Sequence, residues 1–379
     1  MSQVTIIGAG IVGLSHAWMA AKCGHSVTVH ERHANAQGAT IRNFGMVWPI
    51  GQTHGEALAI AQTSRSLWLE FAKDSGLWIN PCGSIHLAHR TDELEVLREF
   101  AEVGPPLGYE VKLLTPAQTL AKAPGANPNG LLGGLWSETE CGVNPRFAVA
   151  TLARWLSAKL GVKIHFSSWV TSVESGDKGP LVNLDNGQVL ESDCVVVATG
   201  SDFRDLFPNQ FANSGVKSCK LQMLATKAQP DAWRIGPHLA SGLTLRHYDN
   251  FRICGSTKSL CQRIAAESPE LDKFGIHVMA SQTEDGRVIL GDSHEYGSDI
   301  TPFDKEIIDH LILDELRKVI FLPNWHIAER WHGIYAKYPG GFAFESQPLP
   351  GVHVSTGTGG SGMTMSMGIA DRFWKTHTI

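Results

Sequence analysis

The first thirty residues contain two short apolar runs, separated by a glycine-rich turn and a segment with helical spacing of apolar residues. Residues 4–7 form a short run of β-branched residues that ends at a glycine-rich turn, residues 8–13. The spacing of apolar residues after this turn predicts a helix to about residue 22, and residues 26–30 form a second apolar run that ends at Glu31. The pattern therefore predicts a strand, a glycine turn, a helix and a second strand within about 30 residues.

The rest of the chain predicts helices and strands in mixed order. Between residues 216 and 300, β runs dominate, with hairpin-like breaks at 248–250 and 284–286. The chain is thus expected to leave the dinucleotide-binding domain and return to it, with a β-rich domain inserted between the two parts. The other expected elements are helices over 57–103 with a break at 80–83 and a strand at 84–88, a helix over 146–160, a strand at 162–166, a hairpin over 181–190, a strand at 195–200 and a helix over 305–319.

Three glycines of the first turn have separate physical roles in a dinucleotide-binding unit. Gly8 allows the tight turn, Gly10 lets the backbone approach a pyrophosphate, and Gly13 permits close packing of the helix on the strand. The helix N-terminus also offers free N–H groups to phosphates. Glu31 is an acceptor for ribose hydroxyls, which argues against a 2′-phosphate despite the neighbouring Arg32. This unit predicts a bound dinucleotide without distinguishing NAD from FAD.

Composition excludes several classes of protein. The chain has 379 residues with 32 basic and 37 acidic side chains, and the net charge of −5 leaves no basic stripe for nucleic acid. No run reaches about 18 consecutive apolar residues, so no membrane span is expected. The seven cysteines contain no C-x-x-C pair, which favours reduced thiols in a cytoplasmic protein. The 17 histidines show no H-x-x-x-H spacing, so no metal site is expected.

A second glycine-rich turn near the end of the chain bears on the choice of dinucleotide. Residues 352–355 predict a strand that leads into the turn at 357–362 and then into a second helix. The strand at 195–200 also ends in the small residues Ala-Thr-Gly. A long dinucleotide needs a second set of backbone amides at its far end, so this turn favours FAD.

These segments resemble the D-amino-acid oxidase family of flavoproteins, which includes glycine and sarcosine oxidases. The resemblance covers nearly the whole chain in the family's order and rests on Gly8–Gly13 with Glu31 and Arg32, Gly38–Met46, Asn144–Arg146, Val195–Gly200, Arg330–Gly333 and Gly359–Ser366. It implies an α/β fold with a discontinuous FAD-binding Rossmann-like domain and a β-rich α+β substrate domain. The expected bounds are 1–80 with 145–215 and 325–379 for the first domain, and 81–144 with 216–324 for the second.

The resemblance also assigns roles around the cofactor. It places the first glycine turn and Glu31 on pyrophosphate and ribose, Val170 against the adenine, and residues 359–363 at the isoalloxazine edge. FAD is expected to be non-covalent because no cysteine follows Cys261. The expected cofactor-binding residues are Gly8, Gly10, Ile11, Val12, Gly13, Glu31, Arg32, Thr40, Arg42, Asn43, Gly45, Met46, Val170, Ala198, Gly200, Gly333, Gly359, Gly360, Ser361, Gly362 and Met363.

The substrate side departs from the family pattern. Amino-acid members use an arginine in the segment after Trp-x-Gly, whereas Gly333 is followed here by Tyr335, Lys337 and Tyr338. A phosphonate has up to two charges and three oxygens and could use several such donors together. Arg246 and Tyr248 are further candidates, because alternate residues of a predicted strand at 243–248 share a face. Ordinary structural roles remain open for all five residues, including a salt bridge for Arg246 and core packing for the tyrosines.

We therefore expect FAD-dependent oxidation of a small amine to an imine, which is then hydrolysed. The run Gly357–Ser366 is similar to that of a subgroup linked with catabolism of 2-aminoethylphosphonate, so this compound or an N-alkyl derivative is the preferred substrate and phosphonoacetaldehyde the product. The alternatives are an oxidase or dehydrogenase of glycine, sarcosine or a D-amino acid, and a flavin-binding protein without turnover. The electron acceptor, oxygen or a quinone, and the oligomeric state stay open.

Overall fold

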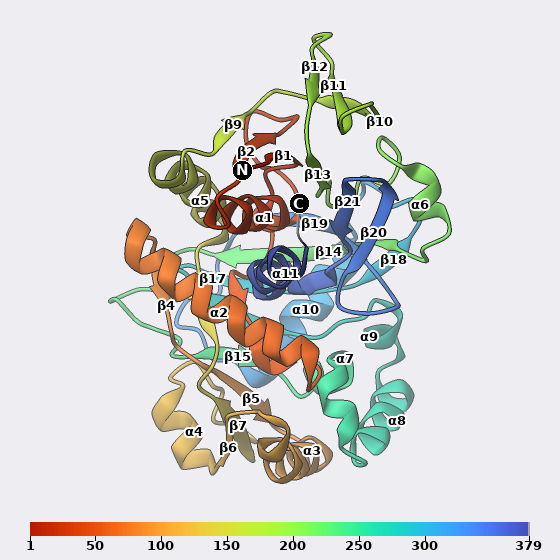
Figure 1. The fold of residues 1–379 in the computed structure, drawn as a ribbon. Coiled ribbons are helices and arrows are strands. Elements are labelled where there is room, and N and C mark those ends of the chain that lie inside the picture. The colour runs from red at the N-terminus through yellow and green to blue at the C-terminus, as the bar shows by residue number, and fades with distance from the viewer. Residues whose placement is uncertain (378–379) are drawn as a thin grey trace.

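The computed structural model describes residues 1–377, and one of its two large sheets is mainly parallel (Figure 1). This six-stranded sheet has the order β20-β21-β13-β1-β2-β9, and every neighbouring pair is parallel except β20–β21. Its strands are β1 (Gln3–Ile7), β2 (Ser26–His30), β9 (Lys163–His165), β13 (Cys194–Val197), β20 (Phe344–Leu349) and β21 (Val352–Thr356).

Both faces of this sheet are covered, which explains why its central strands are apolar throughout. Successive residues of a strand point to opposite faces. Ile6 packs with helices on one face, whereas Ile7 packs with a small antiparallel sheet on the other. The helices are α1 (Ile11–Lys22), α2 (Glu56–Ser75), α5 (Pro145–Leu160) and α11 (Gly362–Thr376), and the small sheet is β10 (Val170–Ser175), β11 (Pro180–Leu184) and β12 (Val189–Glu191).

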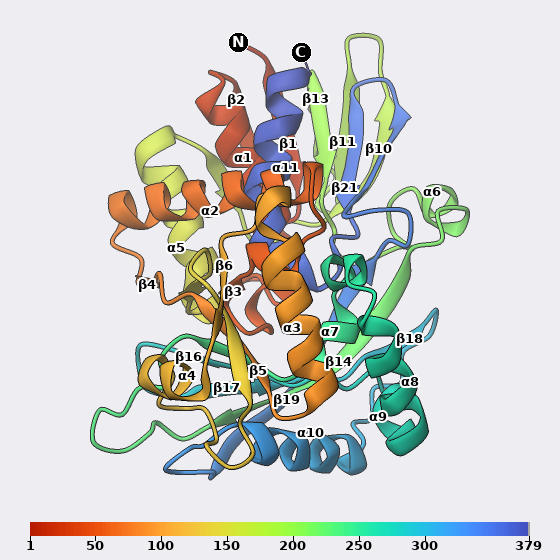
Figure 2. The same cartoon turned by 90° about the horizontal axis from the view of Figure 1, so that it is seen from below.

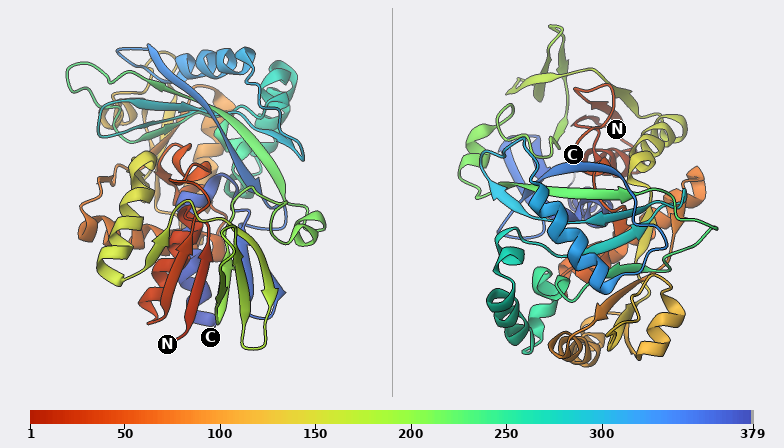
Figure 3. Two further views of the ribbon diagram at one scale, coloured as in Figure 1. Left: turned by 90° about the horizontal axis from the view of Figure 1, so that it is seen from above. Right: turned by 180° about the vertical axis from the view of Figure 1, so that it is seen from behind.

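The second large sheet has nine strands and is mainly antiparallel. Its order is β18-β14-β17-β16-β15-β5-β7-β6, and β19 pairs with β14 along most of its length. Helix α10 (Glu306–Val319) covers the face that points away from the six-stranded sheet (Figures 2 and 3). The strands are β5 (Ser84–Ala88), β6 (Val111–Leu114), β7 (Gly133–Ser137), β14 (Lys217–Thr226), β15 (His238–Ala240), β16 (Met279–Gln282), β17 (Val288–Gly291), β18 (Glu295–Gly297) and β19 (Ile327–Lys337).

Smaller elements connect the two large sheets. A three-stranded sheet, β3-β8-β4, contains β3 (Met46–Val47), β4 (Ile79–Asn80) and β8 (Cys141–Val143). The remaining helices are α3 (Thr91–Val103), α4 (Pro116–Lys122), α6 (Pro208–Ala212), α7 (Thr244–His247), α8 (Thr257–Glu267) and α9 (Pro269–Lys273). Among the described residues, no helix combines the length and the apolar character that crossing a membrane requires.

The two-part α/β architecture expected from the sequence is confirmed, but the expected strand at 243–248 is wrong. This segment forms the short helix α7, and the supposed hairpin break at 248–250 is the start of a 3-10 helix, Asp249–Ile253. The segment 257–273, expected within the β-rich region, forms α8 and α9. In addition, β19 pairs with β14 in the nine-stranded sheet, although the sequence-based bounds put residues 325–379 in the cofactor domain.

Candidate active site

A cavity of about 970 Å3 is lined by segments from both large sheets. One side consists of the two glycine turns and the ends of β1, β2 and β13. The other side consists of residues from β14, β19 and the α7 region. The cavity brings together all the sequence-predicted site residues except Gly13, Gly45, Met46 and Arg246.

The first glycine turn has the close backbone approaches that the sequence predicts. Gly8 has φ +105°, and a Cβ there would lie 2.5 Å from the carbonyl oxygen of Ala198. A Cβ on Gly13 would lie 1.9 Å from the carbonyl oxygen of Gly8, so only glycine lets α1 begin against β1. Gly13 thus acts behind the cavity wall through packing, while Gly10, Ile11 and Val12 line the cavity.

The end of β2 contributes an acidic side chain to the same region. The Glu31 carboxylate accepts the backbone N–H of Ala9 (2.9 Å) and that of His33 (3.0 Å), which ties the glycine turn to β2. A carboxylate has about four lone-pair sites, so it can still accept hydroxyl groups of a ligand. Arg32 is neutralised by Asp202 and Asp205, at 2.5 and 3.1 Å. This pairing agrees with the expectation that no 2′-phosphate binds here.

The segment after β2 is ordered by its own side chains. The Thr40 hydroxyl accepts the N–H of Ile11 at the start of α1, and the Asn43 side chain bonds the backbone at residues 39, 40 and 45. A Cβ on Gly45 would lie 2.0 Å from the carbonyl oxygen of Val143. Gly45 and Met46 were expected to touch the cofactor, but they lie outside the cavity lining because this segment turns into β3 and pairs with β8.

The second glycine turn joins the cofactor side of the cavity to β19. Lys337 at the end of β19 forms a β-bridge with Thr358, and the N–H of Tyr338 donates to the carbonyl of Gly357 (3.2 Å). Gly359 has φ +60°, and a Cβ there would lie 2.9 Å from Cδ of Lys337. Residues 359–363 all line the cavity, and the side chain of Ser361, which precedes α11, does not cap this helix.

The side of the cavity formed by β19 and the α7 region contains tyrosines and a lysine that has no carboxylate partner among the described residues. Tyr335 is buried, and burial raises its pKa well above the ordinary value, so the phenol is a neutral donor. Tyr248 also lines the cavity, with its hydroxyl 3.4 Å from Sδ of Met279. Lys337 lines the cavity and forms no ion pair with any described residue. These groups can donate to an anion from several directions.

Arg246, expected to bind the substrate anion, does not line the cavity. Its guanidinium group bonds the carboxylate of Asp272 and the carbonyl oxygens of Leu271 and Ile276, and so fastens α7 to α9 and the following loop. The expected shared face fails because residues two apart on a helix point about 200° apart. Tyr248 therefore faces the cavity without Arg246.

Three buried residues of the cavity wall, His277, Asp292 and His294, are not among the residues predicted from the sequence. They come from both ends of the β16–β17 hairpin, in which Met279 pairs with Gly291. A signal was present, because the expected turn at 284–286 sets a register that brings residue 277 beside residues 292–294. His247 reaches the same place from α7, which no local pattern predicts.

The histidine side chains of this wall are buried, and burial is the main cause of their lowered pKa values. Burial lowers the pKa of His294 to about 4. The pKa values of His247 and His277 lie well below the ordinary value, mainly because of burial and secondly because of neighbouring groups that carry or can carry positive charge. Burial raises the pKa of the Asp292 carboxyl well above its ordinary value. The imidazole rings are therefore neutral at pH 7.

The geometry fits a long dinucleotide. Two glycine turns face the same cavity, and each leads into a helix that the preceding residue, Gly10 or Ser361, does not cap with a side chain. At α1 the N–H of Ile11 donates to the Thr40 hydroxyl, and the neighbouring backbone of the turn faces the cavity. Free backbone amides at such ends bind phosphates or other acceptors. A Cβ at Gly8 or Gly359 would intrude on neighbouring atoms, so both turns depend on bare backbone. The fold and the site thus define a dinucleotide-dependent oxidoreductase.

Comparison with known proteins gives the family. The chain matches the family described as "DAO: FAD dependent oxidoreductase" over residues 3–373, and it belongs to this family. Its cofactor is FAD, as the second glycine turn predicts.

The relatives and solved structures with which the chain is similar agree with this assignment. It is 29% identical over 176 residues to the mitochondrial sarcosine dehydrogenase of Homo sapiens, a match that covers 45% of the chain and 19% of that protein. It is 26% identical over 280 residues to an opine oxidase component of Rhizobium meliloti, which covers 70% of the chain and 73% of that protein. The glycine oxidase of Bacillus cereus has the same fold, with a TM-score of 0.78 at 16% identity over 99% of the chain and 94% of that structure.

Proposed function

We propose that this enzyme oxidises the C–N bond of a small amine that bears an anionic group, with 2-aminoethylphosphonate or its N-methyl derivative as the preferred substrate. The carbon loses a hydride and the nitrogen a proton, which gives an imine. Water then adds to the imine carbon and the amine leaves, so that phosphonoacetaldehyde is the product. Bound FAD supplies the two-electron acceptor. Relatives named for sarcosine and opine oxidation support the C–N chemistry.

The observation that carries this proposal is the position of Lys337. It is a cation without a carboxylate partner among the described residues, and it lies against Gly359 of the second glycine turn. Within residues 1–377, the only arginines in the cavity lining, Arg32 and Arg42, belong to segments assigned to the cofactor. A lysine point charge with tyrosine hydroxyls suits a tetrahedral anion, whereas a planar carboxylate is best met by an arginine fork.

The wall residues would position the substrate and would not need to act as a base. Tyr335 can donate a hydrogen bond to the anion, since burial keeps its phenol protonated. The anion would then hold the amine carbon over the cofactor, and such positioning supplies much of the rate.

The second candidate is oxidation of glycine, sarcosine or a D-amino acid. The names of several relatives favour it, including the glycine oxidase of Geobacillus kaustophilus, 24% identical over 52% of this chain. Against it stands the segment after Gly333, which contains no arginine.

The test is an anaerobic absorption spectrum of the FAD-loaded enzyme with each amine in turn. Bleaching by 2-aminoethylphosphonate or its N-methyl form at lower concentration than by glycine, sarcosine or D-alanine is the expected result. Preference for the carboxylate amines would overturn the phosphonate proposal, and flavin that no amine reduces would indicate binding without turnover.

A lysine substitution tests the anion site. Lys337→Gln removes a charge-assisted hydrogen bond worth about 1.5–3 kcal/mol, so kcat/KM for the phosphonate amine should fall about 10- to 100-fold. The same substitution at Lys375, an exposed lysine paired with Asp371 on α11, is the matched control. A neutral amine of equal length should be oxidised equally by both variants. Equal loss for charged and neutral amines would remove Lys337 from the anion site.

Three further features are part of this proposal. FAD is held without a covalent bond, which is supported by the absence of any cysteine from the cavity lining in the described part of the chain. The enzyme works in the cytoplasm, which is supported by its seven free thiols. Oxygen or a quinone reoxidises the flavin. Acid precipitation tests the first feature, because non-covalent FAD stays in the supernatant.

A further inference from the structure

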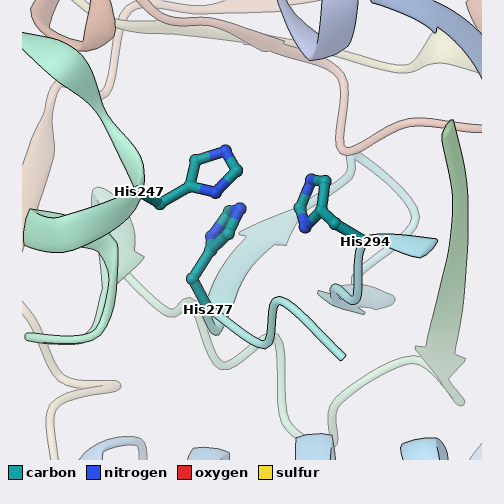
Figure 4. Close-up of side chains that lie close together, drawn as sticks. All are labelled: His247, His277 and His294. Carbon is teal, nitrogen blue, oxygen red and sulfur yellow. The ribbon is translucent and has the colours of Figure 1, made fainter. Parts of the chain in front are cut away.

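Three histidines from separate parts of the chain converge in the cavity wall (Figure 4). His247 belongs to α7, His277 precedes β16, and His294 precedes β18. Each offers one ring nitrogen, and these nitrogens lie within 4.8 Å of one another. The ring centroids are 3.7 Å apart for His247 and His277 and 4.9 Å apart for His277 and His294.

Both ring nitrogens of His277 lack the partners that buried polar groups normally have, and one nitrogen of His294 has a fixed partner. His277 has 3% of its surface exposed, and neither of its ring nitrogens forms a hydrogen bond with any other residue of the described part of the chain. Nδ1 of His294 lies 3.0 Å from the carbonyl oxygen of Gly275. Nδ1 must carry the proton to donate to a carbonyl, so Nε2 is left with a free lone pair. Orphaned buried nitrogens and a fixed tautomer are the features of a metal-ligating imidazole.

The buried carboxyl group of Asp292 adjoins the cluster, and among the described residues it has no lysine or arginine as a partner. Oδ1 of Asp292 lies 3.3 Å from Nε2 of His277, and Oδ2 lies 3.9 Å from Nε2 of His294. Within residues 1–377, no lysine or arginine forms an ion pair with Asp292. Arg246 lies behind the cluster, but it bonds Asp272. Burial without a cation favours the neutral form of the Asp292 carboxyl group, and a positive ion bound beside it would stabilise the carboxylate.

We propose that His247, His277 and His294, with Asp292, bind a divalent transition-metal ion of the zinc class. Imidazole nitrogens suit zinc, copper, iron and nickel, and the carboxylate provides a fourth ligand or neutralises part of the charge. The side chains must draw together by about 1 Å to reach Zn–N distances of about 2.0–2.1 Å. Lys337 faces the cluster from β19 and opposes the ion, and Asp292 offsets that repulsion.

The metal site would have a position open to the cavity, because all four residues line it. An anionic oxygen of the substrate can occupy such a position. This role rests on the proposed function, whereas metal binding itself does not. Nε2 of His294 presents a lone pair to the cluster, and Asp292 adds a carboxyl group. Both would repel an anion, so the neutral histidines are not expected to bind one directly.

The test uses the FAD-loaded enzyme after dialysis against a chelator. Zn2+ alone is titrated by calorimetry, and bound zinc is counted by elemental analysis. One zinc ion per chain is expected, with affinity reduced by more than about tenfold in His277→Gln and in His294→Gln. His310→Gln, an exposed histidine on α10, is the matched control and should bind as the unaltered enzyme does.

Flavin content and the unfolding temperature show whether each variant folds. If the two buried variants do not fold, His247→Gln, at a partly exposed position, replaces them. Absence of stoichiometric zinc in the unaltered enzyme, or equal zinc binding by the cluster variants, would overturn the metal site. If zinc binds but does not change KM for the phosphonate amine, only the substrate role is wrong. Flavin reduction by amines in the metal-free enzyme tests the proposed function separately.

Discussion

Replacement of Gly13 by alanine tests the link between helix packing and cofactor binding. The new Cβ would lie 1.9 Å from the carbonyl oxygen of Gly8, while real Cβ contacts essentially never fall below 3.0 Å. Helix α1 must therefore move from β1 by about 1.1 Å. Both contacting atoms are fixed to the backbone, so a rotamer change cannot relieve the clash.

The expected loss of unfolding free energy in Gly13→Ala results from two opposing effects, and the expected loss of FAD affinity from a third. Overpacking costs about 3 kcal/mol at the upper end of its usual range, and alanine regains about 1 kcal/mol of helix propensity. A net loss of about 2 kcal/mol is expected. If the turn binds the pyrophosphate through two backbone amides, a shift of about 1 Å would also lengthen both hydrogen bonds beyond their useful range. At about 1.5 kcal/mol each, their loss weakens FAD binding by about 100-fold.

The assay combines urea unfolding of the FAD-free protein with a titration of FAD by fluorescence. Gly255→Ala is the matched control, because Gly255 is not among the residues that line the cavity and its Cβ would lie 3.6 Å from Oε1 of Glu99, an ordinary contact distance. It should bind FAD as the unaltered protein does. A Gly13→Ala protein with FAD affinity within threefold of the original, and with unchanged unfolding free energy, would refute the packing argument.

Two further predictions concern stability. Arg246→Gln removes the hydrogen bonds to Asp272 and to two carbonyl groups, so it should lower the unfolding free energy by about 1.5–3 kcal/mol. The KM for the amine should stay within twofold of the original. A raised KM at unchanged stability would show that Arg246 contacts the substrate. His86 has a pKa lowered by burial to about 3, so below its unfolded value of 6.5 the unfolded chain binds one more proton. Stability should therefore fall as the pH falls, by about 1.4 kcal/mol per unit from this residue. Urea unfolding from pH 6 to 4 should give a flatter dependence for His86→Leu, and equal slopes would contradict the assignment.

The sequence predicts those parts of the fold that local patterns determine. The β1–α1–β2 unit and the β11–β12 hairpin follow from glycine positions and apolar runs, and both are present. The segment at 243–248 shows the limit. Six residues are too few to distinguish a helix from a strand by periodicity. The bonds of Arg246 to the α9 region, which are absent from the local pattern, accompany the helical turn that forms there.

The same limit applies to the site. Most cofactor-side residues were predicted because glycine turns act through backbone conformation that the local sequence encodes. The wall with His247, His277 and His294 is assembled from a helix and two ends of a hairpin, so its chemistry depends on tertiary packing. The absence of a metal-ligand spacing along the chain therefore said nothing about ligands brought together in space.

The β-bridge between Lys337 and Thr358 makes the proposed substrate wall and the proposed cofactor turn one mechanical unit. Strand β19 carries Tyr335, and backbone hydrogen bonds at its end join it to the residues that precede α11. Adapting this strand to a different substrate would displace the turn assigned to the flavin edge. Changes in amine preference within this lineage are then expected to alter the flavin spectrum and reduction potential as well, so substrate range and redox properties would evolve together.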